Sequence, residues 1–190
     1  MKKKTITAGI DEVGRGCLAG PVVAAAVILK ESINLALLKD SKKISFKKRL
    51  EVSEHIKSYS HYAIGLASVE EILDLNILQA SLLSMKRALE QLAKEPDLIL
   101  IDGNFAPCGL KNYKTIINGD DKIKVISAAS IVAKVFRDKL MIKLAEEFSN
   151  YAWESNFGYG TKAHLKGLKK FGITSHHRKG FKPVHKILSS

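Results

Sequence analysis

Cysteine is scarce in this 190-residue sequence: only Cys17 and Cys108 occur, and they form no CxxC pair. This scarcity excludes a zinc ribbon and a disulfide scaffold, and we expect both cysteines to be free, buried thiols in a reducing cytosol. Long hydrophobic runs are missing too, since none approaches the roughly 20 residues of a membrane span. The apolar stretch after residues 1–4 is too short for a secretory signal. We therefore expect a cytoplasmic protein with no membrane partner.

Several catalytic and nucleotide-binding motifs are also absent. There is no P-loop, and neither Ser127 nor Ser130 lies in a nucleophile elbow, so a serine hydrolase has no support. Gly14, Gly16 and Gly20 have the spacing GxGxxxG, which differs from a dinucleotide fingerprint. Two acids also precede these glycines, where a bound pyrophosphate would be repelled. The glycines therefore need another explanation.

Acidic residues are few, with 19 Asp and Glu against 31 Lys and Arg, so the formal net charge is +12. A chain with this charge attracts phosphate polyanions, most often nucleic acid. Hydrophobic residues make up 46% of the sequence, which excludes a disordered protein. A chain of this length can also bury a core without disulfides or a structural metal. These features predict a globular protein that binds nucleic acid.

Strand-like and helix-like segments alternate along the chain, which predicts an α/β or α+β domain. Short β-branched and apolar runs predict strands over residues 5–10, 22–29, 61–67, 98–101 and 115–117. Helical spacing predicts helices over residues 46–59, 68–95, 126–148 and 161–171, the second with a break near Asn76. The continuous apolar run 98–101 is typical of a strand that is covered on both faces.

After residue 150 the composition changes, and glycine, histidine, lysine and aromatic residues replace the long aliphatic runs. This change predicts a main domain over residues 1–150 and a basic helical subdomain over residues 151–190. The His176-His177 pair is a weak sign of a metal site, because adjacent residues rarely chelate one ion. We expect instead a solvated basic tail around these histidines and Arg178.

Acids gather at predicted strand ends in this basic chain. Asp11 and Glu12 follow the first strand, Asp102 follows the fourth, and Asp120, next to Asp121, follows the fifth. Ligands collect beyond strand ends in sheets flanked by helices, so we expect these acids to meet. Two carboxylates about 5 Å apart repel by roughly 3 kcal/mol at an effective dielectric of 20, which favours a bound cation. Oxygen-only ligands select magnesium or manganese, and beside a phosphate-attracting surface they indicate two-metal phosphodiester chemistry.

Five sequence blocks resemble one family. Residues 8–23, AGIDEVGRGCLAGPVV, resemble the amino-terminal signature of type 2 ribonuclease H, and of bacterial ribonuclease HII in particular. Further blocks agree in order: Asp40-Ser41-Lys42-Lys43 with Lys47-Lys48-Arg49, LIDGN at 100–104, Gly119-Asp120 with ISAASIVAK at 126–134 and Arg137-Asp138, and GYGT at 158–161 with His164 and His177-Arg178. The resemblance spans nearly the whole chain.

The resemblance implies a ribonuclease H-like α/β fold, with a five-stranded mixed sheet flanked by helices and a small carboxy-terminal helical subdomain. It implies an endonuclease that cuts the RNA strand of RNA–DNA hybrids and cuts at single ribonucleotides embedded in duplex DNA. The products would carry 5′-phosphate and 3′-hydroxyl ends. The implied catalytic and metal-binding acids, which hold two Mn²⁺ or Mg²⁺ ions, are Asp11, Glu12, Asp102 and Asp120. Spacing alone does not separate Asp120 from Asp121, and the Gly119-Asp120 match favours Asp120.

The resemblance also implies substrate contacts. Gly14-Arg15-Gly16 would read the ribose 2′-hydroxyl, and Tyr159 would place its own hydroxyl near the same oxygen. Candidate phosphate contacts are Lys42, Lys43, Lys47, Lys48 and Arg178. A helix-end structural role for Asp138 and a catalytic one stay open. The sequence also leaves open whether the tail binds a sliding clamp or another repair protein, and a monomer is the default expectation.

Two other classes of function fit parts of the sequence. A non-catalytic RNA- or ribosome-binding protein would explain the basic charge but not the clustered acids, which weaken polyanion binding. A metal-dependent phosphatase or kinase-like enzyme acting on small molecules would explain the acids but needs no surplus of positive charge. Cleavage of duplex DNA that contains one ribonucleotide would separate the three.

Overall fold

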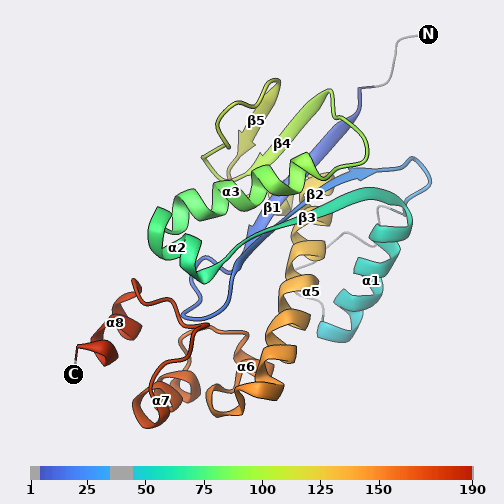
Figure 1. Cartoon of the computed structure of the whole chain (residues 1–190). Coiled ribbons are helices and arrows are strands. Elements are labelled where there is room, and N and C mark those ends of the chain that lie inside the picture. The colour runs from blue at the N-terminus through green and yellow to red at the C-terminus, as the bar shows by residue number, and fades with distance from the viewer. Residues whose placement is uncertain (1–4, 35–44, 190) are drawn as a thin grey trace.

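A five-stranded mixed sheet forms the centre of the structure, a computed structural model that describes residues 5–34 and 45–189 (Figure 1). The strand order is β3-β2-β1-β4-β5. β1 (Thr7–Val13) pairs antiparallel with β2 (Val22–Leu29), which pairs antiparallel with β3 (Ser60–Ala67). On its other side, β1 runs parallel to β4 (Leu98–Asp102), and β4 runs parallel to β5 (Tyr113–Ile116). This arrangement confirms the expected α/β fold with a mixed sheet.

Helices cover both faces of the sheet, as the resemblance implied (Figure 1). One face packs against α1 (Phe46–Ser58) and the long α5 (Lys124–Glu147), and the other packs against α3 (Ile77–Glu90). All residues of β2 except the last are buried, because helices lie above and below it.

Two glycines let the helices approach the sheet closely. A Cβ on Gly9 of β1 would lie 2.3 Å from the backbone of Val125 in α5. A Cβ on Gly65 of β3 would lie 2.1 Å from the carbonyl oxygen of Ser84 in α3. Any side chain at either position would push a helix away from the strand, so these glycines set the thickness of the layers.

The predicted break near Asn76 separates α2 (Val69–Leu75) from α3. Ser68 and Glu71 form the capping box that starts α2. Asn76 adopts a left-handed φ of 71°, and its side-chain oxygen accepts the N–H groups of Leu78 and Gln79 at the start of α3. A single residue thus ends one helix and caps the next.

The carboxy-terminal segment lies beyond the end of α5, below the sheet in Figure 1. It contains the 3₁₀ turn η2 (Ser149–Tyr151), α6 (Trp153–Asn156), α7 (Lys162–Phe171) and α8 (Lys182–Leu188). Its core shares residues with α5 and the loop after β1: Leu18, Ala19, Met141, Ala145, Tyr151, Trp153, Leu168 and Val184. The division at residue 150 stays a prediction. The sequence missed α6 and α8, as well as α4 (Gly119–Lys122).

Two details of the predicted strands are wrong. The first strand continues to Val13, so Asp11 and Glu12 lie within β1 rather than after it. The reason is that β2 continues to pair with them, with Glu12 opposite Ala24. The run 98–101 is also not equally covered on both faces, because the side chains on the α3 face are buried and those on the other face are only half-buried.

Candidate active site

The first two acids of the site lie side by side at the carboxyl ends of parallel strands. Ile10 of β1 is in register with Ile101 of β4, so the next residues along the two strands are Asp11 and Asp102. Asp11 is buried, and Asp102 is the last residue of β4 and half-buried. Strand pairing therefore brings together two carboxylates that are 91 positions apart in the chain.

A third acid is held by the second. One oxygen of Asp102 accepts the N–H of Gly119 at 2.6 Å and the N–H of Asp120 at 3.4 Å, the first two residues of α4. Asp120 is buried beside this contact, whereas Asp121 is exposed. The Asp102 carboxylate thus positions the start of the short helix that carries Asp120.

The local environment opposes the charged form of the acids on β1. Burial raises the pKa of Asp11 well above its ordinary value, and the neighbouring charges of Glu12 and Asp102 add to the shift. The Ser130 hydroxyl of α5 donates to Asp11 and partly opposes the shift. Burial also raises the pKa of Glu12, although the Arg15 guanidinium opposes this shift. A bound cation would relieve the repulsion in this cluster.

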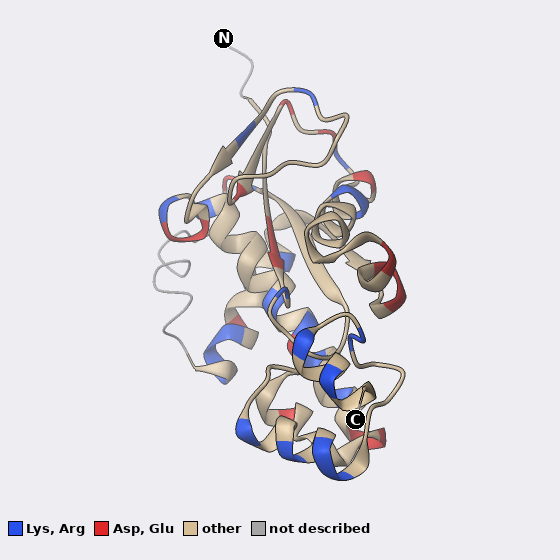
Figure 2. Cartoon of the chain, turned by 90° about the vertical axis from the view of Figure 1, so that its left-hand side faces the viewer, with Lys and Arg blue, Asp and Glu red and all other residues tan. Residues whose placement is uncertain are grey.

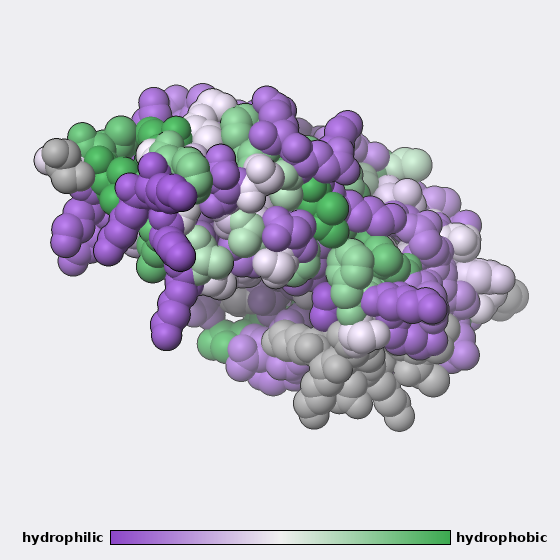
Figure 3. All heavy atoms as spheres, turned by 90° about the horizontal axis from the view of Figure 1, so that it is seen from below, coloured by the Kyte–Doolittle hydropathy of each residue, from purple (hydrophilic) through white to green (hydrophobic). Residues whose placement is uncertain are grey.

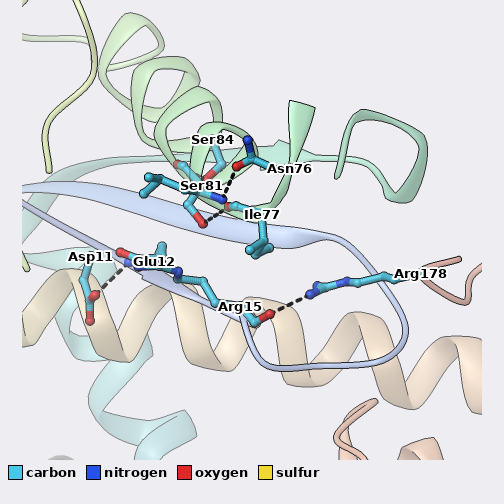
Figure 4. A network of polar contacts seen from close by, with 9 residues as sticks. Asp11, Glu12, Arg15, Asn76, Ile77, Ser81, Ser84 and Arg178 are labelled. Carbon is cyan, nitrogen blue, oxygen red and sulfur yellow. Dashed lines mark hydrogen bonds and ion pairs between the residues drawn. The ribbon is translucent and has the colours of Figure 1, made fainter. Parts of the chain in front are cut away.

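Glu12 itself is paired with a basic side chain. Its carboxylate lies 3.2 Å from the Arg15 guanidinium, and Figure 4 shows both side chains near the end of β1. Carboxylate oxygens are suitable ligands for hard divalent cations. However, the described residues contain no group of three or more His, Cys, Asp or Glu side chains arranged to hold one ion. The structure therefore brings the predicted acids together at one end of the sheet, but their side chains are not arranged around a single ion position.

The loop of residues 14–20, called the 14–20 loop below, connects β1 to β2 and contacts the carboxy-terminal segment. The Leu18 N–H donates to the Gly158 carbonyl at 2.8 Å, and Cys17 forms a bridge pair with Tyr159. Gly16 lies against the Tyr159 ring, since a Cβ there would be 4.0 Å from the ring. Two predicted substrate-reading elements, Gly14-Arg15-Gly16 and Tyr159, are thus neighbours in space.

Two buried histidines hold the backbone at Tyr159. The Trp153 indole N–H donates to His164 Nε2 at 3.1 Å, so this nitrogen is an acceptor, and His164 Nδ1 donates to the Tyr159 carbonyl at 2.9 Å. His177 Nε2, 3.0 Å from His164 Nε2, must then be the donor. His177 Nδ1 accepts the Thr174 N–H at 2.9 Å. Both rings are therefore neutral, and burial lowers the pKa of each, that of His177 to about 3.

The expected solvated tail around His177 and Arg178 is wrong. His177 is fully buried against Trp153 and His164, and Arg178 is buried beneath the 14–20 loop. Arg178 therefore does not present its charge on the surface as a direct phosphate contact would. Composition made this segment look hydrophilic, but its polar groups find partners inside the protein.

The remaining predicted residues, the lysines and Asp138, lie outside the acid cluster or outside the described residues. Lys42 and Lys43 lie outside the described residues. Lys47 and Lys48 are exposed on the first turn of α1, where Lys48 pairs with Glu51 at 2.9 Å. Asp138 is fully buried on α5, and one of its oxygens lies 2.5 Å from Lys134. This pairing favours the structural role for Asp138.

Acidic and basic residues occupy different parts of the surface around the site. Figure 2 shows acidic residues on a strand in the middle of the molecule and basic residues on the helices below it. The underside is largely hydrophilic in Figure 3, in keeping with four exposed lysines on α7: Lys162, Lys166, Lys169 and Lys170. A polyanion that spans the sheet and the carboxy-terminal segment would contact positive charge on that segment and the acids at the sheet.

The chain matches a known protein family over most of its length. The family profile described as Ribonuclease HII matches residues 8–185. The chain belongs to the ribonuclease HII family. A ribonuclease HII from Pelagibacter ubique is 59% identical over 185 residues, which cover 96% of this chain and 99% of the relative.

Solved structures of the ribonuclease HII family share the fold. A ribonuclease H2 structure from Pyrococcus horikoshii has a TM-score of 0.81 and 27% identity, and the match covers 96% of this chain and 97% of that one. The ribonuclease HII in a complex with PCNA from Archaeoglobus fulgidus has a TM-score of 0.73 and 27% identity, with coverage of 93% and 95%. These matches confirm the expected family and fold.

Two predictions about composition can also be compared with the structure. Cys17 and Cys108 are both free thiols, and Cys17 is buried as expected, but the expected burial of Cys108 is wrong because that residue is exposed. None of the helices within residues 5–34 and 45–189 has the length and apolar composition that a membrane crossing requires.

Proposed function

We propose that this ribonuclease H uses two divalent metal ions at the carboxyl ends of β1 and β4 to cut RNA–DNA hybrids. It would also cut at single ribonucleotides in duplex DNA. The observation that carries this proposal is the carboxylate cluster of Asp11, Glu12 and Asp102 in a strongly basic protein, where burial and then repulsion between the acids raise the pKa of Asp11 and of Glu12. Membership of the ribonuclease HII family supports the reaction class, endonucleolytic cleavage of the RNA strand.

Four acids would hold the ions: Asp11, Glu12, Asp102 and Asp120. When bound, Mn²⁺ or Mg²⁺ ions lower the pKa of an attacking water and stabilise the leaving 3′ oxygen, which leaves 5′-phosphate and 3′-hydroxyl ends. Asp102 has a second task, because its contact with the N–H groups of α4 fixes the position of Asp120. Ser130 holds the Asp11 carboxylate from α5. Glu12 would exchange its Arg15 partner for a metal ion.

Ribose recognition would fall to Gly14-Arg15-Gly16 and Tyr159. The glycines let the backbone approach the sugar, and backbone groups can exchange hydrogen bonds with a 2′-hydroxyl that deoxyribose lacks. The Tyr159 ring is 40% exposed beside this loop, so it is accessible to a sugar. His164 supports the position of Tyr159 through its carbonyl group.

The segment of residues 151–190 would act as a substrate-contacting subdomain. Its exposed lysines on α7 suit a duplex backbone, as do Lys47 and Lys48 of α1. Lys42 and Lys43, outside the described residues, stay predicted phosphate contacts. We place the enzyme in the cytoplasm as a monomer, and the PCNA complex of the Archaeoglobus relative supports a sliding clamp as a partner. The binding-only alternative is not favoured, because acids at the centre of the site weaken polyanion binding.

The test is cleavage of a labelled duplex DNA that contains one ribonucleotide, with Mn²⁺, with Mg²⁺ and with a chelator. We expect a metal-dependent cut next to the ribonucleotide, with the ends mapped as 5′-phosphate and 3′-hydroxyl. The matched all-DNA duplex should stay intact. An Asp102→Asn preparation, purified in the same way, controls for contaminating nucleases. Equal cleavage of both duplexes, or cleavage with the chelator present, would contradict the proposal.

A further inference from the structure

Two arginines that are far apart in the chain meet beneath the 14–20 loop. Arg137 of α5 donates to the carbonyl oxygens of Ala19 and Pro21 at 2.9 Å and of Phe157 at 2.8 Å. Arg178 donates to the carbonyl oxygens of Gly20 at 2.9 Å and Arg15 at 3.0 Å, and Figure 4 shows its side chain pointing at the latter. Both side chains are buried, with exposures of 0% and 1%.

These two charges have no acidic partner in the part of the chain that the structure describes. Their acceptors are carbonyl oxygens alone, and the charge of Arg137 adds to burial in lowering the pKa of Arg178 to about 10. Burying two like charges without counter-ions is costly. The arrangement therefore points to a function that needs these carbonyl groups held in place.

The loop is shaped to fit the arginines. Gly14 has a left-handed φ of 96°, and a Cβ at this position would lie 2.2 Å from the Arg137 guanidine nitrogen Nε. The inner surface of the loop thus rests directly on a guanidinium. Because a peptide unit is planar, a carbonyl fixed on the inner side also fixes the N–H groups of the same peptide planes. The N–H groups on the outer side of the loop, next to Tyr159, are therefore held in fixed positions as well.

We propose that Arg137 and Arg178 are positioning residues that hold the backbone of the 14–20 loop in the geometry that distinguishes ribose from deoxyribose. This inference rests on the proposed function, since it assigns the loop the task of reading the 2′-hydroxyl. The buried charges also place positive potential under the loop, where it favours a phosphodiester on the outer surface. The two effects can be separated, because lysine keeps the charge but not the fork of donors.

The experiment compares Arg178→Met, Arg178→Lys and the control Arg87→Lys. Arg87 is a matched control because it also bonds a backbone carbonyl, that of Leu66 at 2.8 Å, but on the far side of the sheet from Arg137 and with Glu71 as an ion-pair partner. Binding is measured with chelator present for a duplex with one ribonucleotide and for the same duplex without it. The readout is the Kd for the all-DNA duplex divided by the Kd for the duplex with one ribonucleotide. KM and kcat for cleavage are measured alongside.

We expect Arg178→Met to reduce the Kd ratio about tenfold, since the loop groups would no longer match the hydroxyl. Arg178→Lys should weaken the discrimination as well, yet keep the affinity for the all-DNA duplex and its salt dependence near those of the unmodified protein. Arg87→Lys should leave the ratio unchanged. A merely structural role would instead lower the melting temperature and leave the ratio intact in the folded protein.

Retention of the unmodified ratio in folded Arg178→Met and Arg178→Lys would overturn the inference. If Arg178→Met does not fold, Arg137→Lys tests the neighbouring arginine, since lysine keeps the charge but not the fork of donors that binds three carbonyl groups, and the same tenfold loss is expected. Failure of the unmodified protein to prefer or cut the ribonucleotide would instead contradict the proposed function, so the two failures are distinguishable.

Discussion

Two regions concentrate charge of one sign: the acids at the end of the sheet and the arginines under the 14–20 loop. They differ in how the surrounding protein compensates that charge. Burial, together with repulsion among the acids, raises the pKa of Asp11 and of Glu12. Arg137 and Arg178 instead direct five hydrogen bonds at backbone carbonyls. The first cluster consists of oxygen ligands that suit a divalent cation. The second binds the protein's own backbone, so it serves as a scaffold.

The sharpest test of this difference is a neutral substitution in each cluster. Asp102→Asn keeps an oxygen that can accept the Gly119 N–H but loses the negative charge. We expect cleavage to fall about 10²- to 10³-fold, the range seen when one preorganised electrostatic group in an active site is removed. Affinity for the hybrid should stay or increase, because one repulsive charge is gone. Single-turnover rates and fluorescence anisotropy measure the two effects, and a rate within tenfold of the unmodified protein would exclude the assignment.

The corresponding change in the arginine cluster should act on folding. Arg137→Met leaves three carbonyl groups without their donors, so we expect a loss of about 3 kcal/mol in the free energy of unfolding. Urea denaturation measures this loss. Lys139→Met on the same helix is the control, since Lys139 is exposed, and a change below about 0.5 kcal/mol is expected there. Equal losses of stability in Arg137→Met and Lys139→Met would show that the buried arginine contributes no more to folding than an exposed lysine, which would contradict its role as a scaffold.

A smaller effect is expected in the pH dependence of stability without metal. The pKa of His177 is lowered to about 3, so its stabilisation is complete above the ordinary value of 6.5 and is lost as the pH falls toward 3. The slope can reach about 1.4 kcal/mol per pH unit. Asp11 acts in the opposite direction, because its raised pKa favours the folded state at low pH. Between about pH 4 and 8, the melting temperature of His177→Gln should depend less on pH than that of the unmodified protein. The melting temperature of Asp11→Asn should be higher near neutrality.

Much of the fold could be predicted from local patterns. Alternation of apolar runs gave the strands and the long helices, and Asn76 and Ser68 marked helix ends through side chains that cap neighbouring N–H groups. The expectation that Asp11 and Asp102 meet followed from the same reasoning, although Asp11 lies within β1 rather than after it. It works because parallel register is a repeating geometry, so Asp11 and Asp102 become neighbours once β1 and β4 pair.

The buried polar cluster could not be predicted in this way. His177 and Arg178 sit in a segment rich in lysine and histidine, which suggests exposure. Their partners are a ring nitrogen of His164 and backbone carbonyls that are 158 and 163 positions away from Arg178 in the chain. No local pattern records such a partner. Arg137 of α5 likewise binds backbone carbonyl groups that are 116 and 118 positions away in the chain.

The long separation between Arg178 and the loop it holds has a consequence for protein synthesis. The residues of the 14–20 loop are translated early, but the donor for the Arg15 and Gly20 carbonyls does not exist until residue 178 has been added. A growing chain on the ribosome can form β1 and β2 yet cannot give this loop its final shape. The nascent enzyme would therefore gain the proposed ability to select its substrate only after residue 178 has been added.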